Sequence, residues 1–282
     1  MIKLSAFSDE AGNSIEEQIS ALKRNGISLM ELRSIDGKNV ADFTEEEAKS
    51  YQKELEENGI SVWSIGSPLG KAEIDVDFTE YSKKVRHVCK LANIFKTSRI
   101  RMFSFFNAYS EEEKVFTYLR EMVKIGNEYG VYMCHENEKD VFGDTAERVL
   151  KIMKNVEGLK YIYDPANYLQ CGQSADETLA IFHSKTDYFH IKDVVGETGE
   201  LVPAGYGDTK IKELIAKIDS EKVLTLEPHL MEFDAYKSID NTEMKHKFTF
   251  ANGQEAFDAA VTALKNILKE LNYKEEKGEF VK

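Results

Sequence analysis

Asn25-Gly26-Ile27 leads directly into the apolar run Ser28–Arg33, and Asn58-Gly59-Ile60 leads in the same way into a run that ends at Ile65. An amphipathic, helix-like stretch precedes each glycine, and a strand-like run follows it at once. Glycine is typical of the residue just past the end of a helix, where the backbone turns into a left-handed conformation. The recurrence therefore predicts a repeating unit of helix, tight turn and strand.

The same alternation of short apolar runs and longer amphipathic stretches continues along the chain, and it predicts eight strand–helix units. Strands are predicted at Ile2–Phe7, Ser28–Arg33, Ile60–Ile65, Arg99–Phe103, Val131–Glu136, Leu159–Tyr163, Tyr188–Ile191 and Val223–Leu226. Helices are predicted at Ser14–Asn25, Thr44–Asn58, Thr79–Phe95, Ser110–Tyr129, Asp144–Asn155, Ala175–Ser184, Asp208–Ile218 and Glu255–Leu271.

Consecutive strands joined through helices must be parallel, with right-handed crossovers. Eight such units favour a closed barrel over an open sheet, so the predicted fold class is α/β, a single (β/α)8 TIM barrel. We expect residues 1–271 to form this barrel domain and residues 272–282 to form a charged, frayed C-terminal tail. The connection 231–253 is interpreted as an elaboration of the last loop. No Gly-x-Gly-x-x-Gly follows the first strand, which disfavours a dinucleotide-binding fold.

The bulk composition narrows the function classes. The 282 residues include 37 basic and 50 acidic ones, for a formal net charge of -13. A chain this acidic is a poor partner for nucleic acid. Three cysteines, with no CxxC pair, argue against a disulfide framework or a thiolate zinc site. Acidic residues near the start and the lack of a long apolar run predict no signal peptide, no membrane contact and a cytoplasmic location.

Four short segments carry ligand-grade side chains just where predicted strands end. They are Cys-His-Glu-Asn-Glu (134–138), Tyr-Asp-Pro-Ala-Asn (163–167), Phe-His-Ile-Lys-Asp (189–193) and Thr-Leu-Glu-Pro-His (225–229). Their side chains Glu136, Asp164, His190 and Glu227 belong to the fifth to eighth strands, which are neighbours in a barrel. The carboxyl ends of barrel strands are where barrel enzymes keep their active sites.

Taken singly, each of these residues has an ordinary structural explanation, such as a surface carboxylate, a turn residue, a core histidine or an ion-paired strand end. Taken together, three clustered carboxylates without a cation would repel one another and raise their pKa values. A bound divalent metal removes that cost. The ligand set of three oxygens and one nitrogen suits one ion of Mn²⁺, Mg²⁺, Co²⁺ or Zn²⁺.

On these residues the chain resembles the xylose isomerase-like TIM barrel superfamily, in its sugar phosphate isomerase/epimerase group, which includes ketose 3-epimerases. Members carry Glu, Asp, His and Glu as metal ligands at the ends of strands five to eight, which Glu136, Asp164, His190 and Glu227 match. Many also carry Gly-Glu-Gly-Asp after the seventh strand. Here Gly205-Tyr206-Gly207-Asp208 replaces that Glu by Tyr, so no role for that carboxylate is carried over.

The resemblance implies a metal-dependent sugar isomerase or epimerase in carbohydrate metabolism, with manganese among the expected metals. Glu136 and Glu227 are then the catalytic pair: one removes a proton next to a ketose carbonyl held by the metal, and the other returns one. Asp164 and His190 mainly hold the metal.

Further residues are candidates for substrate binding, each with a structural alternative. Lys192 can bind substrate oxygens or form a salt bridge in the barrel mouth. Arg101 can meet an anionic group, and Arg33 can do the same or pair with Glu31. Trp63 can stack on a sugar or pack in the core. Asn167 and His229 complete the predicted substrate-binding set.

Other functions stay open at this level. One alternative is a dehydratase acting on a cyclic polyol ketone, which needs the same proton removal. Another is a non-catalytic sugar-binding barrel, and a repair nuclease with a trinuclear zinc cluster is disfavoured because the second and third strands supply no histidine. The partner is expected to be a small sugar or sugar derivative, without nucleic acid. The sequence is compatible with a homo-oligomer. It does not specify the sugar, whether the sugar is phosphorylated, or which metal is bound.

Overall fold

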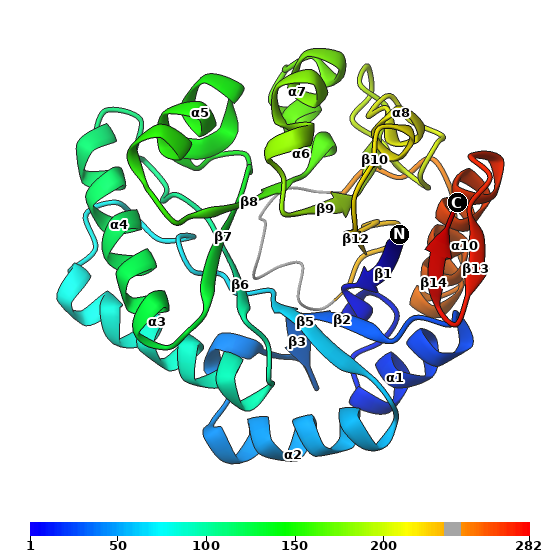
Figure 1. The fold of residues 1–282 in the computed structure, drawn as a ribbon, viewed down its shortest axis with the longest axis horizontal. Coiled ribbons are helices and arrows are strands. Elements are labelled where there is room, and N and C mark those ends of the chain that lie inside the picture. Colours follow the sequence, from blue (N-terminus) through cyan, green and yellow to red (C-terminus); the bar gives the residue numbers. More distant parts are fainter. Residues whose placement is uncertain (234–243) are drawn as a thin grey trace.

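Eight parallel strands close into a ring, seen end-on in Figure 1. The computed structural model describes residues 1–233 and 244–282. Neighbouring strands pair in the order β1, β2, β5, β6, β7, β8, β9, β12, and β12 pairs with β1 to close the ring. The predicted single (β/α)8 barrel is confirmed. The barrel strands are β1 (Ile2–Ala6), β2 (Leu29–Leu32), β5 (Ser61–Ile65), β6 (Arg99–Met102), β7 (Tyr132–Glu136), β8 (Lys160–Tyr163), β9 (Tyr188–Ile191) and β12 (Lys222–Leu226).

Helices surround the ring and cover the outer faces of the strands (Figure 1). They are α1 (Ile15–Arg24), α2 (Glu45–Glu57), α3 (Phe78–Ile94), α4 (Glu112–Glu128), α5 (Ala146–Asn155), α6 (Pro165–Gln170), α7 (Ala175–Phe182), α8 (Ile211–Ala216) and α10 (Gly253–Glu270). Gly26 and Gly59, which follow α1 and α2, have φ of 67° and 72°. The helix ends predicted from these glycines are therefore confirmed.

The short helix α6 was not predicted. Asp164 is its N-cap, because the carboxylate accepts hydrogen bonds from the backbone N–H groups of Ala166 and Asn167, and Pro165 opens its first turn. Both residues are favoured at these positions. The sequence Asp-Pro therefore carried a helix-start signal as well as a turn signal.

The inner face of the barrel changes character along the strands. A small cluster fills the interior with Cys134, Ile162, Tyr188 and Val223. Cys134, Ile162 and Tyr188 each stand two residues before a predicted ligand, so the ligands lie on the same strand face one step nearer the carboxyl ends. The predicted site therefore rests on this small apolar layer.

The expectation of a frayed C-terminal tail is wrong. Two strands in this segment, β13 (Lys274–Glu276) and β14 (Glu279–Val281), form an antiparallel hairpin. β14 pairs with β1 at Ile2 and Lys3, whereas β2 pairs with β1 only at Ser5 and Ala6. The hairpin thus covers the part of the β1 edge that β2 leaves free, and it buries Phe280 at 4% exposure. The many charged residues of this segment led to the wrong prediction, because the buried Phe280 holds it against the barrel.

Loops at the carboxyl ends of the strands carry two further hairpins. β3 (Ser34–Ile35) pairs with β4 (Lys38–Asn39), and β10 (Asp193–Val194) pairs with β11 (Leu201–Val202). The predicted long connection 231–253 falls partly on residues 234–243, which lie outside the described residues. Its described end touches β11, since Leu201 N–H donates to Lys245 O at 2.8 Å. Among the helices of the described residues, none has the length and apolar character needed to cross a membrane. The cytoplasmic location stays a prediction.

Candidate metal centre

Four buried side chains from four neighbouring strands meet at the carboxyl end of the barrel. Glu136 ends β7, Asp164 follows β8, His190 lies in β9 and Glu227 follows β12. Each offers one ligand atom, and these atoms all lie within 4.8 Å of one another. None of the four is more than 3% exposed. The parallel register brings the strand ends together, and the structure thus assembles the predicted metal ligands at one point.

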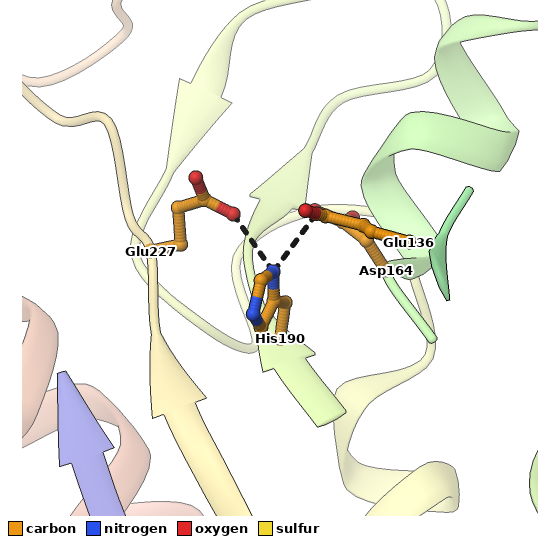
Figure 2. Close-up of side chains that lie close together, drawn as sticks. All are labelled: Glu136, Asp164, His190 and Glu227. Atoms are coloured by element: carbon orange, nitrogen blue, oxygen red, sulfur yellow. Dashed lines mark hydrogen bonds and ion pairs between the residues drawn. The ribbon is translucent and has the colours of Figure 1, made fainter. Parts of the chain in front are cut away.

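His190 lies between the two glutamates (Figure 2). Its Nδ1 is 2.8 Å from Glu136 Oε1 and 3.0 Å from Glu227 Oε2. The ring of Phe7 meets the imidazole edge-on, with centroids 5.3 Å apart. Burial opposes a charge on His190, but Glu136 and Glu31 outweigh it and raise the pKa of the imidazole well above its usual value.

Asp164 divides its two oxygens between the fold and the centre. Oδ1 accepts from Ala166 N at 2.8 Å and from Asn167 N at 3.0 Å, which caps α6. Oδ2 lies 2.9 Å from Lys192 Nζ. Burial raises the pKa of Asp164 to about 6, although Lys192 opposes that shift. The helix cap therefore fixes the orientation in which the second oxygen faces the centre.

The other oxygen of Glu227 contacts two arginines and one histidine. Its Oε1 lies 3.2 Å from Arg33 Nη1, 3.5 Å from Arg101 Nη1 and 3.5 Å from His229 Nε2. Burial acts against ionisation, but Lys192 and His190 overcome it and hold the pKa of Glu227 well below its usual value. Glu227 is therefore held as a carboxylate, the form that binds metal.

The donor atoms fit a divalent metal. Glu136 Oε2, Asp164 Oδ2 and Glu227 Oε2 are buried, and within the described part of the chain none accepts a hydrogen bond of regular geometry. Each has only an ion-pair contact, to Arg101 at 3.3 Å, to Lys192 at 2.9 Å and to His190 at 3.0 Å respectively. Unsatisfied buried carboxylate oxygens are costly, and a cation among them supplies the missing partner. The three oxygens and one nitrogen suit hard or borderline divalent ions.

Four of the predicted substrate-binding residues line a small cleft beside the centre. Arg101, Asn167, Lys192 and His229 face it together with Glu227, and its volume is about 30 Å³. This space holds only about one or two water molecules. Leu201 of β11 also lines the cleft.

Trp63, the fifth predicted substrate-binding residue, is not brought to the centre. Its ring packs edge-on against Tyr188, with centroids 5.9 Å apart, and the Arg99 guanidinium lies 4.1 Å from the ring centre. It belongs with the apolar layer beneath the ligands. The packing alternative for this residue is the one that the structure supports.

The buried carboxylates Asp9 and Glu10 near the centre were not predicted, and the suggested pair of Arg33 with Glu31 is not the one that forms. Arg33 does not pair with Glu31. Its guanidinium binds Asp9 through two bonds of 2.8 Å and lies 3.3 Å from Glu10. Glu31 instead lies 3.1 Å from His190 Nε2. A partial signal existed, because Glu31 and Arg33 alternate with apolar residues on a strand whose burial would demand charge partners. Their partners lie far away in the sequence, so their identity was hidden.

Comparison with known proteins places this geometry in context. A family model described as "Xylose isomerase-like TIM barrel" matches residues 19–270. The solved structures similar to this chain include the probable 3-DHS dehydratase AsbF of Bacillus anthracis, at 18% identity and a TM-score of 0.72, covering 94% of this chain and 99% of that one. No functionally curated protein gives a significant match.

Two further structures share the fold at similar levels. An L-ribulose 3-epimerase is 16% identical with a TM-score of 0.72, covering 96% of this chain and 97% of that one. The IOLI protein, described with a bound zinc atom, is 14% identical with a TM-score of 0.72, covering 95% and 99%. At these identities the likeness establishes the common barrel.

Proposed function

The chain belongs to the xylose isomerase-like TIM barrel family, and from that premise we propose that it is a divalent-metal-dependent sugar isomerase or epimerase. The observation that carries the proposal is the placement of Glu136 and Glu227. Their carboxylates approach the same nitrogen of His190, at 2.8 and 3.0 Å, and Figure 2 shows them on either side of it. Two carboxylates so arranged can act on opposite faces of one substrate carbon.

The proposed reaction uses these two glutamates for proton transfer. When bound, a divalent ion supplies Lewis acidity to the neighbouring carbonyl and hydroxyl oxygens of a ketose, which makes the adjacent C–H more acidic. One of Glu136 and Glu227 removes the proton of that C–H, and the other returns a proton to the opposite face, so that the configuration is inverted. Return of the proton to the neighbouring carbon gives aldose–ketose isomerisation instead.

Residues of the cleft are proposed to bind the substrate. Arg101 and Lys192 are buried cations beside the catalytic pair, and both can donate hydrogen bonds to hydroxyl or carbonyl oxygens. Asn167 places its side-chain nitrogen 3.5 Å from Glu136 Oε1, so it orients that carboxylate as well. His229 stands on the opposite side, by Glu227. Trp63 is left out of this set because it packs below the ligands.

A dehydratase is the second candidate, and Lys192 is the observation that favours it. Elimination of water requires a group that protonates the leaving hydroxyl, and epimerisation does not. The Lys192 ammonium faces the cleft next to Asp164, where it can serve as that acid. The fold likeness to a probable dehydratase is consistent with this alternative.

Isotope exchange tests the proposal and separates the two candidates. The metal-free chain is loaded with Mn²⁺ in D₂O and incubated with a panel of ketoses and cyclic polyol ketones. Deuterium at carbons next to the carbonyl, without loss of water, supports the isomerase or epimerase. Loss of water with a new conjugated ketone identifies the dehydratase. A chain that holds metal but exchanges no substrate proton contradicts both and leaves the sugar-binding barrel.

Variants assign the roles. Glu136→Gln and Glu227→Gln are expected to abolish exchange. Glu221→Gln is the matched control, since Glu221 pairs with Lys3 on the exposed surface at 2.9 Å and should exchange normally. Exchange that survives in Glu227→Gln at the wild-type rate would remove Glu227 from the mechanism.

A further inference from the structure

The imidazole of His190 has a third carboxylate contact that the proposed reaction does not use. Its Nδ1 faces Glu136 and Glu227, while its Nε2 lies 3.1 Å from Glu31 Oε2. Glu31 comes from β2, which is separated from β9 in the ring by β12 and β1. Both side chains are fully buried. Glu31 therefore reaches the histidine from the far wall of the barrel.

Glu31 is itself held in place. Its other oxygen, Oε1, accepts a hydrogen bond from the Tyr188 hydroxyl at 2.8 Å. The same hydroxyl lies 3.0 Å from Ser64 Oγ. Glu31 is not in the group of four whose ligand atoms converge. Both of its oxygens are thus engaged, one by a fixed phenol and one by the histidine, which leaves it with a defined orientation.

The two nitrogens of His190 must play different parts. A histidine binds metal through a nitrogen that carries a lone pair, so the proton of the neutral ring sits on the other nitrogen. Only Nδ1 faces the carboxylates of the centre, and the proton must therefore sit on Nε2. Glu31 is the acceptor at hydrogen-bonding distance from that atom. A carboxylate in this position fixes the tautomer and the ring orientation of a ligating histidine.

We propose that Glu31 is a positioning residue: it accepts the Nε2–H of His190 and so directs the Nδ1 lone pair into the metal centre. In this proposal Glu31 contacts neither the substrate nor the metal, and it acts only through His190. The inference rests on the metal centre of the proposed function and not on the type of reaction. A merely structural ion pair would contribute to stability without changing how the histidine binds metal.

Metal affinity of the full chain is the first test. Mn²⁺ binding is measured by calorimetry on metal-free wild type, Glu31→Gln and Tyr188→Phe. Glu31→Gln should weaken binding about 10–100-fold, the usual effect of losing such a partner. Tyr188→Phe should weaken it less, because Glu31 keeps its contact with His190 and loses only the hydrogen bond from the Tyr188 hydroxyl. Glu138→Gln is the matched control: Glu138 is a nearby half-buried glutamate that pairs with Lys71 at 2.9 Å, and its loss should leave the affinity close to wild type.

Nitrogen NMR of the Zn²⁺-loaded chain, labelled at its 6 histidines, is the second test. In wild type the proton of His190 should be found on Nε2, and in Glu31→Gln this state should be lost or mixed. Wild-type affinity in a folded Glu31→Gln, or a proton on Nδ1 in wild type, overturns the proposal. If Glu31→Gln does not fold, Mn²⁺ affinity and the protonated nitrogen of His190 are measured in Tyr188→Phe instead. Wild-type values for both would then overturn the proposal.

The outcomes separate this inference from the proposed function. A wild-type chain that binds metal but exchanges no ketose proton contradicts the proposed reaction and leaves the role of Glu31 standing. A wild-type chain that binds no divalent metal overturns the centre and the role of Glu31 together.

Discussion

The Lys192 ammonium lies 2.9 Å from Asp164 Oδ2, and both side chains are buried. Asp164 is one of the four converging ligands, so Lys192 neutralises the same oxygen that a metal would use. Burial opposes the charge on Lys192, but Asp164 and Glu227 outweigh it and raise the pKa of the ammonium group. Lys192 therefore stays charged beside the centre, where it would compete with a bound cation for Asp164.

Replacing Lys192 should separate catalysis from metal binding. In Lys192→Met we expect proton exchange to fall on the order of 10²-fold or more, since a charged donor beside the reacting atoms is lost. Mn²⁺ affinity should stay equal or rise, because a competing cation has gone. Exchange rates and calorimetry on the same preparation measure both. A variant that loses metal affinity would show that Lys192 supports the ligands instead.

Asp164 should reveal its two roles in a matched pair of variants. Asp164→Asn keeps a side-chain acceptor for the N–H groups of Ala166 and Asn167, and Asp164→Ala does not. Both variants should lose Mn²⁺ affinity by more than about 100-fold. Loss of a residue that only hydrogen-bonds to a metal ligand costs up to about 100-fold in affinity, and loss of a ligand itself should cost more. Only the alanine variant should lose a helix cap, which costs about 1 kcal/mol. Urea unfolding of the metal-free variants tests this difference; equal stabilities would contradict the capping role.

Metal should stabilise the wild-type chain. An ion at 100 times its dissociation constant adds about 2.7 kcal/mol to the free energy of unfolding, which corresponds to about 5–10 °C in Tm for a chain of this size. The thermal shift on adding Mn²⁺, Co²⁺, Mg²⁺ or Zn²⁺ to chelator-treated protein measures it. His190→Ala is the control and should show little shift. An unchanged wild-type Tm with all four ions would contradict the metal centre.

Glu10 should make stability depend on pH. Burial raises the pKa of Glu10 from 4.5 to about 8, against the opposing charge of Arg33. Because the folded chain keeps this proton where the unfolded chain has released it, the resulting stability is present below pH 4.5 and is lost as pH rises to about 8. The slope is at most about 1.4 kcal/mol per pH unit. In Glu10→Gln the free energy of unfolding should change less between pH 4.5 and about 8 than it does in wild type. The same pH profile in both chains would contradict this role of Glu10.

The C-terminal hairpin should be a structural element independent of the centre. Phe280 is 4% exposed and belongs to β14, which pairs with β1 at Ile2. Phe280→Ala should reduce the free energy of unfolding by about 3 kcal/mol and leave Mn²⁺ affinity unchanged. The exposed Lys282→Ala is a matched surface control at the same terminus. Wild-type stability in Phe280→Ala would show that the hairpin does not anchor the chain.

The barrel could be predicted because its signals are local. Apolar periodicity distinguishes strand from helix, and Gly26 and Gly59 mark the turns between them with positive φ. The hairpin at the C-terminus was missed for the complementary reason. Its stability comes from pairing with Ile2 and Lys3 at the other end of the chain, and charge-rich local sequence contains no sign of such a partner.

The four candidate ligands could be named from the sequence because each ends a predicted strand, and parallel strands bring their carboxyl ends to one edge. That reasoning determined which four side chains converge. Tertiary structure alone decided what surrounds them: Trp63 below the centre, Lys192 on Asp164, and Glu31 behind His190. Which side chains meet across a closed barrel depends on how the ring closes and on the register of its strands. The apolar periodicity of the sequence specifies neither the closure nor the register.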